Sequence, residues 1–386
     1  MPTSKLLYNV GDRPKVKALL LYSFQLLLAI LTATIAVPTL IGLPTQIPAA
    51  ILGGGIGTLV YIAFTKGKSP IVISSSFAYL AAFPTALAFG YLGIVVGGIF
   101  SGLIYIIIAI IVKFVGTQWI NKLMPPVIVG PVVALIGLSL AGSAMSNIAT
   151  ANASSLSGQY NLVSLLCGLI TFFVVVVCSV QNRFKRLKVV PFVVGILVGY
   201  LLTSIFTAIG NANNIDYLKI VNWSPIVNNY NPLTWNSFIS VPKISILGAI
   251  EEIINNAPSN DTILAVAANH PELFGGIEIK EANLELIKKI LELNSLMPQA
   301  ITGVGIASVA IAFCPISLVS FAEHLADHKN VSRIIDHDLL NDSPGLHRTL
   351  LGDGVGTMAG TAFGICPNTS YGEGIACVAL TRNASV

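Results

Sequence analysis

Residues 321–328 read Phe-Ala-Glu-His-Leu-Ala-Asp-His, and they end an apolar run that begins near Ile301. The stretch carries two carboxylates and two imidazoles where a membrane helix ordinarily carries no charge. A charged side chain at membrane depth costs about 2.5–3.5 kcal/mol on insertion scales, so it marks a functional site by default. Glu373, within 367–374, is identified as the other carboxylate in a spanning stretch. The sequence therefore predicts one site that combines the two stretches.

The composition indicates a polytopic membrane protein. Of 386 residues, 54% are hydrophobic and 10% are charged, and the mean hydropathy is +0.81. Soluble globular domains carry roughly 25% charged residues. The net charge of +4 is no sign of a nucleic-acid partner, because the basic residues are dispersed among short loops and not clustered into a basic face. The five cysteines form no CxxC pair, so we expect neither a disulfide nor a metal site. The N-terminus shows no signal-peptide pattern, so we expect no cleaved leader.

The number of spans is predicted from the length of the apolar segments. A helix needs about 20 mostly apolar residues to cross a bilayer. This rule predicts ten spans, at 18–37, 47–64, 70–90, 93–113, 126–146, 161–180, 189–209, 301–324, 348–365 and from Tyr371 onward. A polar segment at 210–244 comes directly after the seventh span.

The distribution of Lys and Arg predicts a cytoplasmic N-terminus, because cytoplasmic loops carry an excess of both residues. With the N-terminus inside, the inner segments with Lys or Arg are 5–17, 66–68, 113–122, 183–188 and 329–348. The outer connections without either residue are 38–46, 88–92 and 147–160. We therefore expect a multi-pass protein of the cytoplasmic (inner) membrane.

Two spans are expected to be interrupted by short strands. The third opens Ser69-Pro-Ile-Val-Ile-Ser-Ser-Ser-Phe77, and its β-branched and hydroxyl residues favour an extended piece followed by a half-helix. The tenth opens similarly, with Pro367-Asn-Thr-Ser-Tyr371. Irregular backbone at membrane depth persists only where it is buried in protein or lines a wet cavity. Interrupted segments in corresponding places of two halves indicate a transporter's binding site and an inverted repeat.

We expect an all-α fold in three parts. Residues 1–244 would form a first repeat of seven spans, 245–300 a polar outer insertion, and 301–386 an incomplete second repeat. Within the insertion, the spacing of apolar residues at 281–293 predicts an amphipathic surface helix. We interpret the insertion as a solvated loop, with a partner-docking segment as the alternative.

Glu323 and His328 are the residues of the first stretch that we assign to function. Five positions along one helix place them about 140° apart, so a hydrogen bond between them is feasible. A carboxyl group in an apolar cavity can exchange a proton near neutral pH, and a histidine can relay it. His324 and Asp327 are interpreted instead as polar residues at a helix end, in water.

Glu373 follows Gly372, and a glycine lets a ligand approach the backbone closely. A half-helix that begins here would turn free N–H groups and the positive end of its dipole into a cavity. Carboxylates and backbone N–H groups together suit a small flat imide or amide. An inorganic anion suits the site less well, because no cationic side chain is expected in the cavity. The competing interpretation is that Glu373 caps its own helix.

Several separated motifs resemble the nucleobase–cation symporter family, which includes uracil, xanthine and urate permeases. These motifs are Ala33–Pro38, Gly55–Tyr61 with Lys66–Lys68, Ser75–Ala78, Pro125–Pro126, Val133–Gly142, Ala322–His324 with His328, Asp338–Leu340, Pro344–Arg348, and Pro367–Glu373 through Arg382. The resemblance covers nearly the whole chain except 245–300.

The resemblance implies a fourteen-span fold built from two inverted seven-span repeats. Spans 1–4 and 8–11 would form a core domain, and spans 5–7 and 12–14 a gate domain. A nucleobase would bind between spans 3 and 10 at the middle of the membrane. Since about ten spans are seen, we expect the chain to be a fragment of a longer permease.

The resemblance also implies roles for single residues. Glu323 and Glu373 match the family's substrate carboxylates, and His328 matches the histidine linked to proton coupling. Glu323 is expected to take part in proton coupling as well. Tyr371 and the backbone of Gly372 match the substrate contacts of span 10.

Two more substrate contacts are implied, together with two departures from the family pattern. Phe77 matches the contact from the strand of span 3, and Ala33 matches a wall residue of span 1. Ser74 stands where uracil permeases usually have glycine. Gly374-Ile-Ala376 stands where the family has Asn-x-Gly.

The function implied is proton-coupled uptake of uracil by alternating access, and nothing indicates an enzyme. A xanthine, urate or other purine permease is one alternative. A non-transporting, truncated membrane protein with an outer binding segment is an alternative of another class. We expect no cofactor, H⁺ as the coupling ion with Na⁺ as the alternative, a nucleobase and the lipid bilayer as partners, and no nucleic acid. A homodimer is left open.

Overall fold

The structure is a computed structural model that describes residues 6–386 except 152, 154–158, 182–190, 224–241 and 275–278. Its contacts divide the chain into two units. Unit 1 comprises residues 1–133 and 242–386, and unit 2 comprises 134–241. The predicted inner loop 183–188 and most of the predicted polar segment 210–244 lie outside the described residues.

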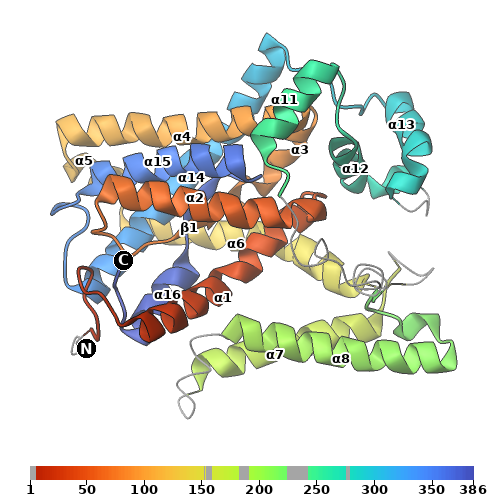
Figure 1. Ribbon diagram of the computed structural model, residues 1–386, viewed down its shortest axis with the longest axis horizontal. Coiled ribbons are helices and arrows are strands. Elements are labelled where there is room, and N and C mark those ends of the chain that lie inside the picture. Colours follow the sequence, from red (N-terminus) through yellow and green to blue (C-terminus); the bar gives the residue numbers. More distant parts are fainter. Residues whose placement is uncertain (1–5, 152, 154–158, 182–190, 224–241, 275–278) are drawn as a thin grey trace. The chain divides into compact units, whose positions relative to one another are not determined.

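Unit 1 contains most of the helices and both strands (Figure 1). Its α-helices are α1 (Val16–Leu40), α2 (Ile47–Thr65), α3 (Phe83–Leu87), α4 (Gly90–Val115), α5 (Gln118–Leu123), α11 (Ser245–Asn255), α12 (Asn260–Ala268), α13 (Leu284–Leu293), α14 (Gly303–Ile335), α15 (Leu346–Phe363) and α16 (Gly372–Thr381). Its 3-10 helices and strands are η1 (Pro44–Gln46), η2 (Phe77–Ala81), η5 (Pro271–Leu273), η6 (Glu281–Asn283), β1 (Ile73–Ser75) and β2 (Asn368–Ser370). Helix α6 (Pro126–Ala149) crosses from unit 1 into unit 2.

The hydropathy of the described helices confirms a multi-pass membrane protein. Six of them are long and apolar enough to cross a bilayer, namely Val16–Leu40, Pro44–Thr65, Gly90–Val115, Leu162–Val180, Val194–Asn213 and Gly303–Ile335. Each falls on a predicted span. Helices α6 and α15 lie on the predicted spans 126–146 and 348–365.

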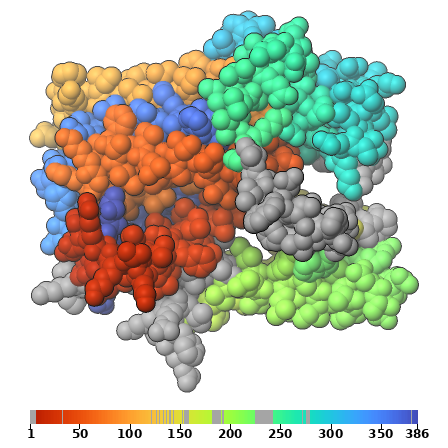
Figure 2. Space-filling model, in the orientation of Figure 1, coloured from red at the N-terminus to blue at the C-terminus, as the bar shows by residue number. Residues whose placement is uncertain are grey.

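Helix α15 packs closely between α2 and α4 (Figure 1). Glycines make this approach possible. A Cβ atom at Gly57 of α2 would lie 2.9 Å from the carbonyl oxygen of Gly356, and one at Gly354 would lie 2.8 Å from that of Gly102 in α4. Small residues let membrane helices approach at backbone distance. Figure 2 shows α15 as a band between the surfaces of α4 and α2.

The two strands pair with each other inside unit 1. They run antiparallel, with Ile73 opposite Ser370. The hydroxyl of Thr58 in α2 donates to the carbonyl of Ile73 at 2.8 Å, and the side chain of Asn368 donates to the carbonyl of Gly53 at 3.0 Å. Both strands are buried in protein, as extended backbone at membrane depth requires.

Helix α14 is longer than the span predicted at 301–324, since it continues to Ile335. The predicted end of the span is wrong because hydropathy depends only on which residues are present, and polar residues occur after Phe321. Hydropathy does not show whether the side chains of these polar residues point into the protein or into water. The stretch 321–328 therefore lies in the middle of a continuous helix, one turn or more from its C-cap at Asp336.

The segment 245–300 is also different from the solvated loop that the sequence suggests. It contributes to the same apolar core as α3 and the end of α1, through the buried residues Ala249, Ile263, Ala265, Val266, Ala267, Phe274, Ile287 and Leu291. The side-chain amide of Asn269 donates to the carbonyl of Ile41 at 3.2 Å. The solvated interpretation is wrong because α12 and α13 each bury an apolar face. The amphipathic helix expected at 281–293 corresponds to α13.

Unit 2 contains the greater part of α6, together with α7 (Leu162–Val180), α8 (Pro191–Asn213) and η4 (Asp216–Leu218). Helices α7 and α8 pack against each other. Asn161 caps α7 by accepting from the N–H groups of Val163 and Ser164, and its amide donates to the carbonyl of Tyr217 at 2.8 Å. These bonds connect the start of α7 to the turn that follows α8.

Candidate functional site

The strand pair lies beside α14 and the first turn of α16. The site residues predicted from the sequence come to this region from four elements. Glu323 and His328 belong to α14, Tyr371–Glu373 to the start of α16, Phe77 to the start of η2, and Ala33 to α1.

The two predicted substrate carboxylates are neighbours in space. Glu323 and Glu373 are both partly buried, and they are near enough for electrostatic repulsion. Asp327 and Asp353 also interact electrostatically with Glu323. The structure therefore brings Glu323 and Asp327 of α14 near Glu373 of α16, although 50 positions separate Glu323 from Glu373, and Asp353 of α15 lies within electrostatic range.

Asp327 belongs to this region and does not lie in water at a helix end, as the sequence analysis expects. Its exposed fraction is 7%. Its Oδ2 atom accepts from the hydroxyl of Ser370 at 2.6 Å, and a Cβ atom at Gly372 would lie 4.0 Å from its Oδ1. The expectation fails because Asp327 follows Glu323 by four residues and so shares its helix face.

The start of α16 offers hydrogen-bond donors. Ile375 is the first residue of the helix whose backbone N–H donates to a carbonyl oxygen, that of Tyr371, at 3.3 Å. The N–H groups of 372–374 precede it, at the positive end of the helix dipole. Tyr371 is fixed to the strand region, because its hydroxyl donates to the carbonyl of Ser75 and its N–H donates to that of Val72.

Phe77 and Ala33 lie close in sequence to a hydrogen bond that links α1 to β1. Phe77 is partly buried at the start of η2, and Ala33 is buried in α1. The neighbouring Thr34 forms a hydrogen bond of 2.9 Å with Ser74. A Cβ atom at Gly54 would collide with the Ser74 side chain. The serine that departs from the family pattern is thus accommodated by a partner hydroxyl and a facing glycine.

His328 does not bond to Glu323, and the predicted hydrogen bond is wrong. Its Nε2 atom lies 2.7 Å from the hydroxyl of Tyr61, and its Nδ1 lies 2.7 Å from the carbonyl oxygen of His324. Both ring nitrogens are therefore occupied. The angular separation of about 140° between positions i and i+5 turns the imidazole away from the carboxylates.

His324 and Asp353 form a buried pair that the sequence analysis misses. Both side chains are fully buried, and His324 Nδ1 lies 2.6 Å from Asp353 Oδ2. The assignment of His324 to a solvated helix end is wrong, and so is the view that Glu373 is the other carboxylate within a spanning stretch. Asp353 lies inside the span predicted at 348–365, and that position is the signal that could have identified it.

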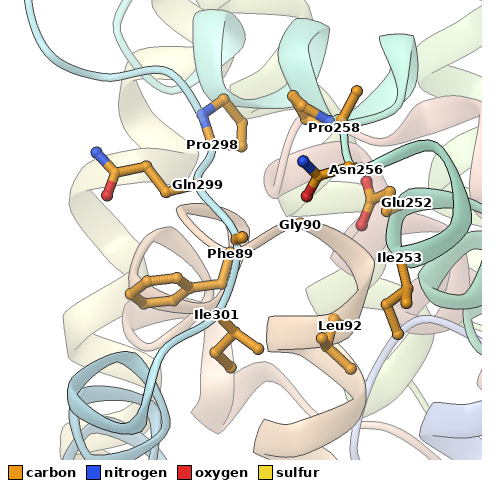
Figure 3. Close-up of a pocket in the computed structure, with 12 residues that line it drawn as sticks. Phe89, Gly90, Leu92, Glu252, Ile253, Asn256, Pro258, Pro298, Gln299 and Ile301 are labelled. Atoms are coloured by element: carbon orange, nitrogen blue, oxygen red, sulfur yellow. The ribbon is translucent and has the colours of Figure 1, made fainter.

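Among the described residues, no group of three or more His, Cys, Asp or Glu side chains is placed to hold a metal ion. A surface pocket of about 260 Å³ lies apart from the carboxylates, between the start of α4, α11 and the segment before α14 (Figure 3). Its one acidic residue, Glu252, accepts hydrogen bonds from the N–H groups of Tyr91 and Ser259 and from the hydroxyl of Thr262. This carboxylate holds α4, α11 and α12 together.

Comparisons with known proteins identify relatives along nearly the whole chain. A model described as the Permease family matches residues 17–255 and 283–386. The uracil permease of Bacillus caldolyticus is 32% identical over 384 residues, which cover 99% of this chain and 71% of that protein. The uracil permease of Bacillus subtilis (strain 168) is 30% identical over 391 residues, which cover 100% of this chain and 72% of that protein. The uracil permease of Escherichia coli (strain K12) is 30% identical over 377 residues, which cover 97% of this chain and 68% of that protein.

Proposed function

The chain belongs to the permease family that these relatives represent, and from this membership we propose that it carries uracil across the cytoplasmic membrane. Permeases move their substrates without converting them, so the protein is a transporter and not an enzyme. The observation that carries the proposal is the meeting of Glu323, Glu373 and the start of α16 beside the strand pair.

This arrangement suits the chemistry of uracil, which is a flat ring with two N–H donors and two carbonyl acceptors. Glu323 and Glu373 accept hydrogen bonds from the two N–H groups. The free N–H groups at 372–374 donate to a carbonyl oxygen, and Gly372 lets the ring approach the backbone. The aromatic face of Phe77 provides an apolar wall. A few convergent polar groups beside an apolar surface are typical of small-molecule sites.

Proton coupling is proposed to centre on Glu323. The carboxyl groups of Asp327 and Glu373 lie within electrostatic range of Glu323, and carboxylates that repel one another are stabilised when they share a proton. His328, which the resemblance links to coupling, touches Tyr61 and the backbone of His324. Any part it takes in coupling therefore passes through those groups and not through a bond to Glu323.

Alternating access is proposed to move unit 1 against unit 2. Unit 1 holds the spans expected for a core domain, and unit 2 holds most of the residues of spans 5–7, which the resemblance assigns to a gate domain. This division supports the expected separation of the first repeat into core spans and gate spans.

A cytoplasmic N-terminus is supported by contacts among the basic loops. Lys68, after α2, donates to the hydroxyl of Ser343 at 2.8 Å. Thr117, after α4, donates to the side chain of Asn341 at 2.7 Å. These bonds bring the loops after α2, α4 and α14 to one end of unit 1. Lys66 and Lys68 lie in the first of these loops. Lys113 and Lys122 flank the second, and Arg333 and Arg348 flank the third, which is typical of the cytoplasmic side.

Uptake of labelled uracil by cells that express the protein tests the proposal. We expect Glu373→Ala to reduce uptake to the level of cells without the protein, because the site loses one of its N–H acceptors. Glu285→Ala, at an exposed side chain of α13, is the control and should leave uptake unchanged. Uptake by Glu373→Ala within twofold of the wild type would contradict the assignment of the site.

A competition panel separates the alternatives. We expect unlabelled pyrimidines, and not xanthine or urate, to displace labelled uracil. Stronger competition by purines would indicate a purine permease instead. A wild-type protein that reaches the membrane and takes up no nucleobase would favour the non-transporting alternative.

A further inference from the structure

The four polar side chains at 323–328 occupy two faces of α14. Glu323 and Asp327 point toward β2 and α16, where Asp327 bonds to Ser370. His324 and His328 point the other way, toward α15 and α2, and all of their ring nitrogens have partners. The histidine pair is therefore joined to the scaffold and is separated from the proposed ligand.

The hydrogen-bond partners of His324 determine where its protons lie. The hydroxyl of Thr349 donates to the carbonyl of Leu346 at 3.0 Å, so its oxygen accepts from His324 Nε2 at 3.2 Å. One further proton then sits between His324 Nδ1 and Asp353 Oδ2. Whichever atom carries that proton, the pair has no net charge. A buried histidine and carboxyl group are thus held together without adding charge to the interior.

His328 is fixed by similar reasoning. A carbonyl oxygen can only accept, so Nδ1 donates to His324, and Nε2 of the neutral ring accepts from Tyr61. The hydroxyl of Tyr61 in turn accepts from Ser69 at 2.8 Å. The two imidazole rings stack with centroids 3.8 Å apart and an interplanar angle of 24°. The histidines form one rigid unit between α15 and α2.

Helix α14 packs mainly against α4, and its backbone rarely comes close to α15. Side chains make the connection. Phe321 and Leu325 of α14 share an apolar cluster with Leu346 and Leu350 of α15. Apolar contacts are not directional, so they permit some rotation of the helix, whereas a hydrogen bond between buried groups fixes an angle. The bond from His324 to Asp353 supplies that direction between α14 and α15, in addition to the bonds from Tyr61 to His328 and from Ser370 to Asp327.

We propose that Asp353 and His324 form a positioning pair for the substrate site. The pair fixes the rotation of α14, and this rotation presents Glu323 and Asp327 to the strand pair and to the start of α16. Successive residues of a helix point 100° apart, so the direction of each side chain depends on the rotation of the helix about its axis. A small rotation of α14 about its axis would therefore move both carboxylates away from the ligand. The inference rests on the proposed function for its ligand, but the geometry of the pair does not depend on uracil.

Equilibrium binding of labelled uracil to the purified protein tests the pair, with thermal unfolding recorded in parallel. We expect Asp353→Ala to weaken uracil affinity at least tenfold. Asp353→Asn should remain within threefold of the wild type, because its amide can donate to Nδ1 of a neutral His324. His324→Gln, whose amide can donate to the Asp353 carboxylate, provides a second conservative variant.

The matched control is Thr361→Val. Thr361 is fully buried on α15, but its hydroxyl donates within α15 to Thr357, and the change preserves its volume. Its affinity should stay within twofold. Unchanged affinity in Asp353→Ala would overturn the proposal. Affinity in Asp353→Asn as weak as in Asp353→Ala, with the thermal midpoint recovered, would show that the carboxyl group acts chemically and would also overturn it. If Asp353→Ala does not fold, the variants His324→Ala and His324→Gln are compared by the same criterion.

A reporter that needs no substrate separates this proposal from the proposed function. In a Glu323→Cys background, we measure the rate at which a small maleimide modifies the new thiol. Adding Asp353→Ala should change that rate at least fivefold, whereas adding Thr361→Val should not. A wild-type protein that binds no uracil refutes the proposed substrate, while an unchanged labelling rate refutes the positioning pair.

Discussion

The carboxylate face and the histidine face of α14 differ although they alternate along the same eight residues. On the first, Glu323 is partly buried and its carboxylate finds no hydrogen-bond partner among the described residues. On the second, His324 and His328 are fully buried and every ring nitrogen is bonded. A group with unfilled hydrogen-bonding capacity is available to a ligand, and a filled one supports the fold. Residues that are adjacent in the sequence can therefore differ in role, one binding a ligand and the next stabilising the fold.

The largest effect is expected on the carboxylate face. Glu323→Gln keeps the size of the side chain but removes a charged acceptor for an N–H group. Hydrogen bonds to charged groups contribute about 1.5–3 kcal/mol, so uracil affinity should fall by roughly 10- to 150-fold. The thermal midpoint should change little, because no described residue depends on this carboxylate. Equilibrium binding and thermal unfolding of the same preparation measure both quantities. A large loss of stability with intact affinity would remove the distinction between the faces.

The opposite pattern is expected on the histidine face. Tyr61→Phe removes the hydroxyl that bonds to His328 and Ser69, and it leaves a buried ring nitrogen without a partner. Such a group costs about 1–3 kcal/mol of unfolding free energy. Uracil affinity should stay within threefold, and Tyr200→Phe, at an exposed ring, should change neither quantity. A variant of normal stability whose uptake loses its pH dependence would instead assign His328 to proton coupling.

The smallest effect is expected at Asp327. In Asp327→Asn the side-chain oxygen still accepts from Ser370, while the negative charge beside Glu323 is lost. We expect uracil affinity to change by about two- to fivefold, in keeping with about 0.5–1 kcal/mol. Asp327→Ala, which also breaks the bond to Ser370, serves as the comparison in the same binding measurement. Equal effects of the two variants would show that the hydrogen bond is unimportant.

Most of the spans could be predicted from the sequence because hydropathy and length are local properties. The predicted spans at 18–37, 47–64 and 93–113 differ from α1, α2 and α4 by only a few residues at their ends. The end of α14 could not be predicted in this way, because polar residues in a membrane helix give the same composition whether they face water or the protein. The packing of 245–300 could not be predicted for a related reason. Its helices carry many charged residues on one face, so the segment as a whole reads as polar although another face is apolar and buried.

The candidate site could be predicted only in part. Glu323 and Glu373 were identifiable because each interrupts an apolar stretch, and a glycine precedes the second. Asp353 was missed although it lies in a predicted span, since its partner is 29 residues earlier on another helix. The partners of His328 could not be inferred either, because Tyr61 approaches from the other end of the chain. Hydrogen bonds between distant helices depend on packing, which single-sequence patterns do not encode.

The pairing of β1 with β2 has a consequence for how the protein is made. The register joins Ile73 to Ser370, so roughly 300 residues must be synthesised before the first strand meets its partner. At about 5–20 residues per second, this takes on the order of 15–60 s. During that time, β1 already follows α2 in the nascent chain and its edge has no β-partner. The insertion machinery or neighbouring helices must shield that edge, and the binding site cannot mature before β2 has been made.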